Sequence, residues 1–460
     1  MTRMSASSGA RSADVTVVGG GAIGTCVAAE LARRGASVVL LERGPELASG
    51  CSAGNAGIVG ASHVTPLANP GALRDGIRWM ARSDSPFFVR PRPRVLPWLL
   101  RFAAASTPQR TRRHTAVLRE LATHSAALHA RLAAAGLNAG YTQRGLLNVY
   151  KSERALAAAL DELARNGGRQ RVATDSLPDD LASSLTPIAG AIFDPDEAHC
   201  DPHGFVRAVG AMAREQGVDV RTGAEVLEVR RRGRRIDSLW TTAGEFRVGE
   251  VVLAAGVWTA ALARRAGLRL PLEGGKGYHV DVEARPGDPQ MPIWLHENRV
   301  VITPLDDRLR IAGTLELTGT DNDVDARRVD AIVGAARRAM PELGSRRPLN
   351  VWRGLRPCTP DGLPVIGRVP KLDNAIVAAG HGMWGLQLAP LTGQLVGDIA
   401  VGDESEHDLH PLRPERFTLR HRPGRPTRVT AARAPDTDRL RDERAVGSAR
   451  RPTHGPGVNA

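Results

Sequence analysis

The sequence has few cysteines, few aromatic residues and no long apolar run, and each deficit excludes a class of protein. Its 4 cysteines, Cys26, Cys51, Cys200 and Cys358, are widely spaced and form no Cys-x-x-Cys pair. Neither a zinc site nor a disulfide framework is predicted, and we expect no bound metal. No stretch approaches the roughly 18 apolar residues that a membrane-spanning helix needs, and residues 1–13 lack the apolar core of a secretory signal, which favours a cytoplasmic protein.

Lysine is scarce, although the formal net charge is +13. The segment beyond Phe417 alone holds ten arginines against four acidic residues, so the rest of the chain is only mildly basic. Aromatic residues form 4% of the sequence, which is too few for a base-stacking platform, and no nucleic-acid partner is expected. Residues 418–460 show little apolar periodicity and are predicted to be a disordered basic tail.

The N-terminal part of the chain has the pattern of a strand, a tight turn, a helix and a second strand. Residues 15–18 form a β-branched run, 19–24 a glycine-rich turn, and 26–34 a segment with helical spacing. Residues 37–41 read as a buried strand that ends at Glu42. This is a βαβ unit, and it predicts a parallel sheet.

The spacing Gly19-x-Gly21-x-x-Gly24 has a specific use between a strand and a helix. The first glycine allows a sharp turn, the second lets a pyrophosphate approach the backbone, and the third lets helix and strand pack closely. The phosphates then lie at a helix N-terminus, where free amides favour an anion. Glu42 ends the next strand, where a carboxylate binds a ribose hydroxyl and disfavours a 2′-phosphate, so FAD or NAD is favoured over NADP.

The length of 460 residues is too great for one compact core and indicates two domains or an interleaved pair. We expect an α/β fold in which a Rossmann-like dinucleotide-binding domain is interleaved with an α+β substrate domain containing an antiparallel sheet. The predicted boundaries are 14–70, 196–268 and 351–417 for the three parts of the dinucleotide domain, 71–195 for a helical insertion and the start of the substrate domain, and 269–350 for the substrate sheet.

Further motifs accompany the first glycine turn, and together they resemble one family. They are Cys51-Ser-Ala-Gly-Asn-Ala-Gly57, Lys276-Gly-Tyr278, Gly354-Leu-Arg-Pro357 with Thr359-Pro-Asp-Gly362, and Gly380-His-Gly382. From about Asp14 to Phe417 the chain is similar to the FAD-dependent D-amino-acid oxidase superfamily, and within it to the bacterial D-amino-acid dehydrogenase branch of the small-subunit type. Several separated motifs in the right order are more specific than a single glycine turn.

The resemblance implies a flavoenzyme. It implies FAD, a hydride taken from an amine-bearing Cα, and an imino acid that water hydrolyses to a 2-oxo acid and ammonia. Dehydrogenase members pass the electrons to a quinone or another carrier, whereas oxidase members use oxygen. Some relatives attach the flavin through a cysteine in the C-terminal motif; the matching position here is Arg356, so we expect non-covalent FAD.

The candidate catalytic residues are Arg356, Tyr278, Lys276 and His381. Arg356 matches the family's carboxylate-binding arginine, and a guanidinium holds a carboxylate through two charge-assisted bonds. Tyr278 either donates to the same carboxylate or packs against the sheet. Lys276 is a candidate to lie near flavin N5 and tune the acceptor step, and His381 either contacts the flavin or substrate or is a structural histidine in a tight turn.

The candidate cofactor-binding residues come from six separated stretches. The glycines near residue 380 let the backbone approach the flavin, and the helix that follows them presents N–H donors where negative charge develops. Met383 and Trp384 either contact an apolar substrate side chain or pack in the core. The full set is Gly19, Gly21, Ala22, Ile23, Gly24, Glu42, Arg43, Ser52, Ala53, Asn55, Ala56, Gly57, Val226, Ala255, Gly256, Gly380, Gly382, Met383, Gly385 and Leu386.

One segment suggests contact with a membrane surface. Basic residues at 90–94 precede the apolar run 95–100, and such a pairing can dock on the anionic inner face of a membrane. The alternative is a proline-stiffened loop that leads into a buried helix, which we favour.

Three functions stay open at this level. The first is dehydrogenation of D-amino acids, or of a D-hydroxyproline-type imino acid, with a quinone or other acceptor. The second is an oxygen-using amine oxidase of the glycine or sarcosine type. The third is a flavin-bearing structural or electron-relay subunit of a complex.

Overall fold

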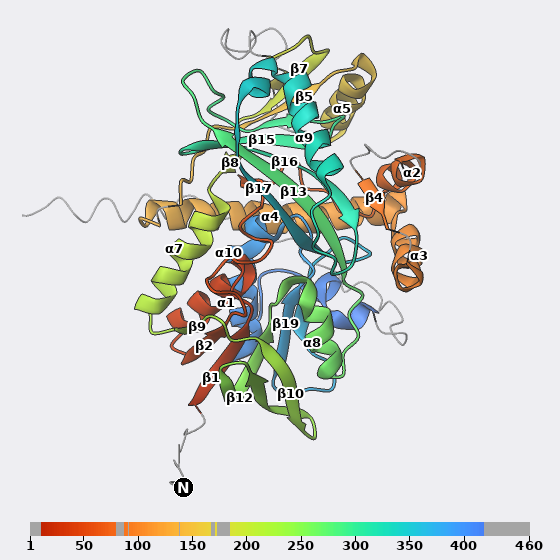
Figure 1. Ribbon diagram of the computed structural model, residues 1–460. Coiled ribbons are helices and arrows are strands. Elements are labelled where there is room, and N and C mark those ends of the chain that lie inside the picture. The colour runs from red at the N-terminus through yellow and green to blue at the C-terminus, as the bar shows by residue number, and fades with distance from the viewer. Residues whose placement is uncertain are drawn as a thin grey trace, which may run out of the picture. The chain divides into compact units, whose positions relative to one another are not determined.

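The computed structural model of the chain describes residues 11–79, 87–90, 92–137, 139–166, 171–172 and 185–417. Its elements form two sheets, drawn at the bottom and the top of Figure 1. The predicted disordered tail, 418–460, lies outside the described residues.

The first sheet has β1 (Arg11–Val18) near its centre, as the glycine-rich turn predicts. β1 pairs in parallel with β2 (Val38–Leu41) on one side and with β12 (Gly244–Leu253) on the other. Beyond β2 lies β9 (Asp219–Arg221), and β12 pairs in parallel with β19 (Ala375–Ala379). The remaining strands are antiparallel: β10 (Val226–Arg232), β11 (Arg235–Thr241) and β18 (Val365–Arg368).

Alternating apolar side chains give this sheet two buried faces. Val17 and Leu40 pack into one apolar cluster with helix residues, and Val18 and Leu41 pack into a second cluster on the other face. The first face is covered by α1 (Ala22–Arg33), α7 (Pro202–Glu215) and α10 (Gly385–Val401). α8 (Thr259–Arg265) packs on the second face, and apolar side chains of β10 and β11 belong to the same cluster.

The second sheet is mainly antiparallel. Its strands follow the order β17, β13, β16, β15, β14, β5, β7 and β6, with β4 beside β16. α9 (Ala326–Ala339) packs its apolar side on one face. The strand bounds are Pro348–Cys358, Glu273–Glu283, Arg308–Leu317, Val300–Leu305, Ile293–Leu295, Leu146–Tyr150, Gly190–Asp194, Arg171–Val172 and, for β4, Phe87–Val89.

The other elements connect the two sheets. A two-stranded ribbon pairs β3 (Ile58–Val59) with β8 (Ala198–His199), and the long helix α4 (Pro108–Ala134) crosses between the sheets in Figure 1. The remaining helices are α2 (Pro70–Trp79), α3 (Leu96–Ala105), α5 (Glu153–Asn166), and the short 3-10 segments Pro93–Val95, Gly256–Trp258, Pro341–Ser345, His410–Leu412 and Pro414–Phe417. The chain passes repeatedly between the sheets, which confirms the expected fold class, a Rossmann-like sheet interleaved with an α+β part.

The basic and apolar segment at 90–100 folds partly into the protein. The Trp98 indole N–H donates to the Cys358 carbonyl at 3.2 Å, and its ring stacks on Phe102. Leu96 and Leu100 are exposed on the outer side of α3. In the described part of the chain, every helix is too short or too polar to cross a bilayer.

Candidate active site

The glycine-rich turn is packed so closely that side chains are excluded. Gly19 has φ +115°, and a Cβ there would lie 2.5 Å from the Ala254 carbonyl oxygen of the neighbouring strand connection. A Cβ on Gly24 would lie 1.8 Å from the Gly19 oxygen. These contacts bring β1, the end of β12 and α1 together at the edge where ligands bind in parallel sheets.

The N-terminus of α1 is open to an anion. Its first turn, which includes Ala22 and the half-buried Ile23, contains no acidic residue. The Ala22 N–H donates to the Ser52 hydroxyl at 3.0 Å, and a Cβ on Gly21 would lie 3.0 Å from the same oxygen. Backbone amides and a hydroxyl therefore line a cradle without a negative charge, which fits a pyrophosphate.

Glu42 is held where the sequence predicts a ribose contact. Its carboxylate accepts from the N–H groups of Gly20 and Gly44, each at 2.6 Å. Each carboxylate oxygen keeps a further lone pair for a hydroxyl. The adjacent Arg43 places its guanidinium 3.6 Å from the centre of the Trp258 ring, a cation–π contact.

The other predicted nucleotide contacts surround this edge. Ala255 and Gly256 follow β12, and Gly256 takes φ +56° as it starts a short 3-10 segment. Val226 begins β10, two residues after Ala224, whose N–H donates to the Glu42 carbonyl at 2.8 Å. The contacts of Val226, Ala255 and Gly256 with the nucleotide stay predictions.

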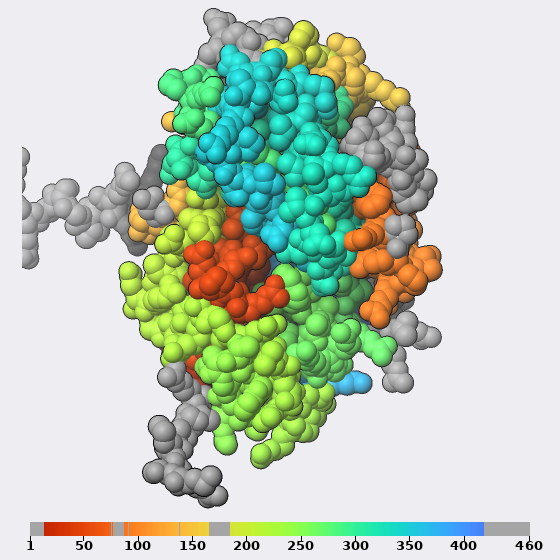
Figure 2. Space-filling model, in the orientation of Figure 1, coloured from red at the N-terminus to blue at the C-terminus, as the bar shows by residue number. Residues whose placement is uncertain are grey.

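The segment 51–57 links the two sheets. The Asn55 amide donates to the Met383 carbonyl at 3.2 Å, and the Gly57 N–H donates back to the Asn55 side chain at 2.9 Å. Arg310 of the second sheet donates to the carbonyls of Ala53 and Asn55, which lie in the same turn as Ala56. In Figure 2 an early part of the chain, drawn in red, lies at the surface between the green and blue-green parts.

A cavity of about 720 Å³ lies beside this segment. Its walls combine apolar side chains, among them Ile58, Leu315, Met383 and Trp384, with Arg356. An apolar cavity of this size with a few polar groups is typical of a small-molecule site.

Arg356 of β17 reaches this cavity by crossing its neighbouring strands. A Cβ on Gly277 of β13 would lie only 1.9 Å from the Arg356 Nη1, so the glycine leaves the space that the guanidinium fills. The same Nη1 donates to the Thr314 carbonyl of β16 at 2.8 Å. Burial lowers the pKa of Arg356, and the ionisable groups that act on it are the thiols of Cys51 and Cys358. Among the described residues it pairs with no carboxylate, so its charge is available to an anionic ligand.

Lys276 and Tyr278 point to the opposite face of β13. The Tyr278 hydroxyl donates to Glu316 at 2.9 Å, and the Lys276 ammonium lies 3.6 Å from the Glu316 carboxylate and donates to the Asp323 carbonyl. Arg328 of α9 donates to the other oxygen of Glu316 at 2.8 Å. Because side chains alternate along a strand, Gly277 faces Arg356 whereas its two neighbours face this buried network. Lys276 and Tyr278 thus contact the Glu316 network, and their expected contacts with flavin and substrate stay predictions.

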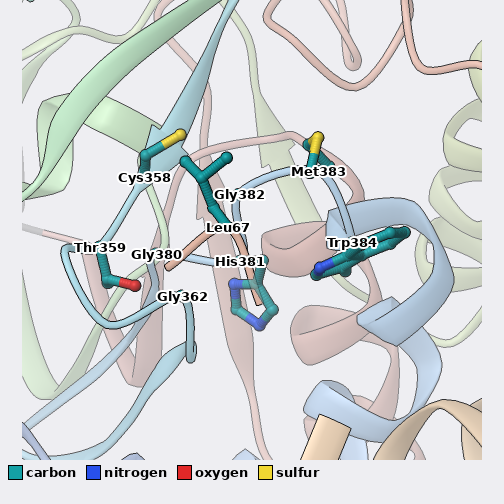
Figure 3. Close-up of a pocket in the computed structure, with 9 residues that line it drawn as sticks. All are labelled: Leu67, Cys358, Thr359, Gly362, Gly380, His381, Gly382, Met383 and Trp384. Carbon is teal, nitrogen blue, oxygen red and sulfur yellow. The ribbon is translucent and has the colours of Figure 1, made fainter. Parts of the chain in front are cut away.

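His381 is buried in the turn before α10, as Figure 3 shows. Its Nε2 lies 3.0 Å from the Thr392 hydroxyl, and burial lowers its pKa to about 3. The small cavity beside it, about 10 Å³, has room for about one water molecule. This placement fits the structural alternative for His381 better than a contact with substrate.

The C-terminal glycines shape the same turn. Gly380 and Gly382 have φ +77° and +56°, and a Cβ on Gly380 would lie 2.6 Å from the Thr359 methyl group. α10 begins at Gly385 and Leu386, with no acidic residue in its first turn. Met383 and Trp384 line both cavities, so this turn joins the glycine motif to the larger cavity.

A cluster of polar residues on the cavity wall was not predicted from the sequence. It consists of Ser62, His63, Asn148, Asp194 and His296, which all line the cavity, and Glu197 behind them. Ser62 and Asn148 both donate to Asp194, at 2.9 and 3.0 Å, and Asn148 Oδ1 lies 2.9 Å from His296. These residues share no motif and come from separate segments near 62, 148, 194 and 296, so the spacing gave no signal for them.

Comparison with known proteins agrees with this geometry. Residues 14–399 match the family described as FAD dependent oxidoreductase (DAO). The chain belongs to this family; it is an FAD-dependent oxidoreductase, and FAD is its cofactor.

Individual relatives define the branch that the chain resembles. It is 34% identical over 418 residues to a D-amino acid dehydrogenase of Paramagnetospirillum magneticum, covering 88% of this chain and 99% of that protein. It is 31% identical over 432 residues to a D-amino acid dehydrogenase of Cereibacter sphaeroides, covering 91% and 99%. Among solved structures, glycine oxidase from Geobacillus kaustophilus superposes with a TM-score of 0.71 at 28% identity, over 88% of this chain and 99% of that one.

Proposed function

We propose that this flavoenzyme oxidises D-amino acids and anchors their carboxylate at Arg356. The observation that carries the proposal is the half-buried Arg356 guanidinium, which lines the large cavity and pairs with no described carboxylate. A planar guanidinium binds a carboxylate through two parallel bonds, so it fixes orientation as well as position. The relatives named D-amino acid dehydrogenase support the choice of substrate.

The chemistry at the site is mainly one of positioning. Bound FAD supplies the acceptor for the hydride from Cα. Arg356 holds the substrate carboxylate, while Met383, Trp384 and Leu315 form apolar walls that exclude water from the reacting bond. The N-terminus of α10 favours negative charge near its free amides. The imino acid product leaves the site and is hydrolysed to a 2-oxo acid and ammonia.

Anaerobic mixing tests this function directly. The flavin spectrum is followed after addition of paired D and L forms of alanine, methionine, arginine and aspartate, and of proline. Bleaching by D forms and not by L forms is expected. A flavin that none of these compounds bleaches would contradict the proposal and favour a structural or electron-relay subunit instead.

The electron acceptor is proposed to be a quinone or another carrier, since the relatives above are named dehydrogenases. The second candidate, an oxygen-using amine oxidase, is favoured by the superposition on a glycine oxidase. Admission of air to the bleached enzyme separates them. Slow reoxidation that a soluble quinone accelerates supports the dehydrogenase, whereas fast peroxide formation supports the oxidase.

We also propose that the FAD is held without a covalent bond. Cys358, two residues after Arg356, is buried, and burial raises the pKa of its thiol to about 12. A Cβ on Gly275 would lie 2.8 Å from its sulfur, so the thiol is enclosed by β13. Acid precipitation should leave a colourless pellet and yellow supernatant; a yellow pellet would contradict this.

A further inference from the structure

His63 and Glu197 form a buried pair on the wall of the substrate cavity, outside the motifs that define the family resemblance. His63 Nδ1 lies 2.8 Å from Glu197 Oε2, and their side chains are only 6% and 2% exposed. His63 lines the cavity together with Arg356. Because Nδ1 faces Glu197, Nε2 is the ring nitrogen left for a ligand in the cavity.

The fold places this pair through the ribbon of β3 and β8. Ile58 pairs with His199 and Val59 with Ala198, so Gly60 comes opposite Glu197. A Cβ on Gly60 would lie 2.1 Å from the Glu197 carboxyl carbon, so the carboxylate packs directly on the glycine backbone. The Ser62 N–H donates to the other carboxylate oxygen at 2.8 Å. The backbone thus fixes the position of the carboxylate independently of His63.

The imidazole ring is held from both sides as well. The centres of the Trp294 and Trp384 rings each lie 5.4 Å from the His63 ring centre. Although burial opposes ionisation of Glu197, its contact with His63 and the bonds from Ser62 lower the pKa of Glu197 overall. A carboxylate, an oriented imidazole and an open cavity form the arrangement that serves proton transfer in other enzymes.

We infer that His63 is the general base for the substrate amine, with Glu197 as its positioning residue; this rests on the proposed oxidation of amino acids. An amino acid arrives as an ammonium, and its nitrogen has no lone pair to form the C=N bond. His63 Nε2 takes one proton, which leaves a neutral amine and an imidazolium opposite the Glu197 carboxylate. The Cα–H electron pair and hydrogen then leave as hydride for the flavin, and the amine lone pair forms the iminium.

The charged and titratable groups around His63 come from several elements. Burial and the charge of Arg299 together lower the pKa of His296 to about 3, so His296 stays neutral beside the base. The groups that face or share the cavity are Glu197 in the turn before β8, Asp194 of β7, His296 after β14, Arg299 beyond it, Arg119 and Glu162 on α4 and α5, and Arg356 of β17.

The test is the pH dependence of flavin reduction by the D-amino acid that reduces the wild type fastest. His63→Gln and His63→Asn should each lower the rate at pH 7 by about 10²-fold, the lower end of the usual contribution of a general base. Most of the loss should disappear above the pKa of the substrate ammonium, where the amine arrives without its proton. Glu197→Gln should also lower the rate of flavin reduction at pH 7, by a smaller factor, and the loss should again become smaller at high pH.

A matched control is available in a second histidine–glutamate pair. His407 Nδ1 lies 3.0 Å from Glu120, outside the residues that line the cavity, so His407→Gln should keep the wild-type profile. Binding of 2-aminoisobutyrate, which has no α-hydrogen and cannot be oxidised, is measured from the flavin spectrum. Its affinity at high pH should be equal in wild type and both His63 variants.

The outcomes are distinct. If no amino acid bleaches the wild-type flavin, the proposed function fails. If the wild type is reduced and both His63 variants keep its rate and pH profile, His63 is not the base and the inference is overturned. The inference is also overturned if the variants lose only affinity for 2-aminoisobutyrate while their rates of flavin reduction depend on pH as the wild-type rate does. Equal flavin content and unfolding midpoints in all variants separate these results from misfolding.

Discussion

The two faces of strand β13 carry similar charges but use them differently. On one face Lys276 and Tyr278 meet Glu316, and Arg328 completes the network. On the other face Gly277 leaves room for Arg356, which meets only a carbonyl among the described residues. A cation whose charge is balanced by a carboxylate contributes to the fold, whereas a cation without such a partner is available to bind an anionic ligand.

The largest expected effect comes from removing the unbalanced charge. Arg356→Gln should lower the second-order rate of flavin reduction by about 10²–10³-fold, since loss of one partner from a buried charged pair costs about 3–4 kcal/mol. The unfolding midpoint should stay the same or rise, because the variant no longer buries an unpaired cation. Stopped-flow reduction and thermal unfolding measure both; a large fall in stability with an unchanged rate would reverse the assignment of the two faces.

The same change on the opposite face should act on stability instead. Glu316→Gln leaves Lys276 and Arg328 without their shared carboxylate, and we expect a loss of about 3 kcal/mol in the free energy of unfolding. Denaturant titration of the FAD-bound enzyme measures it. The rate of flavin reduction per bound flavin should remain near the wild-type value, and a selective loss of rate would show that this network reaches the substrate.

A third effect depends on pH and on His381. Its pKa is about 3 in the folded chain, against about 6.5 for an unfolded histidine, so between these values only the unfolded chain binds the proton. The stability from this side chain is complete above about pH 6.5 and falls by about 1.4 kcal/mol per pH unit as the pH drops toward 3. His381→Gln should give a shallower dependence between pH 7 and 5. Equal slopes would mean that His381 titrates normally.

The smallest expected effect distinguishes the two interpretations of Tyr278. Tyr278→Phe removes one hydrogen bond to Glu316 and should cost about 1 kcal/mol of stability. The Michaelis constant for the amino acid should not change, because Tyr278 is absent from the residues that line the described cavities. A Michaelis constant raised by tenfold or more would restore Tyr278 as a carboxylate ligand.

Local patterns in the sequence predicted the parallel half of the fold well. The expected strand over 37–41 is β2 (Val38–Leu41), and the expected helical segment over 26–34 lies almost wholly in α1 (Ala22–Arg33). Glycine spacing worked because Gly19 and Gly24 are required by contacts within one βαβ unit.

Positions that depend on strand pairing were harder to predict. The motif Lys276-Gly-Tyr278 was identified, but its two polar residues and not its glycine were named as candidate site residues. One sequence does not tell which face of a strand lies against the cavity. His63 and Glu197 meet only through the pairing of β3 with β8. That pairing joins two short strands across long intervening segments, and periodicity does not encode it.

The placement of β19 beside β12 has a consequence for biosynthesis. The Rossmann-like sheet is completed by residues 375–379, and the turn that follows supplies the walls near Met383 and Trp384. A nascent polypeptide emerging from the ribosome therefore lacks a finished flavin pocket until more than 380 residues have been translated. Vitamin-derived cofactor is captured late, and a messenger truncated upstream of this point yields a protein that stays colourless.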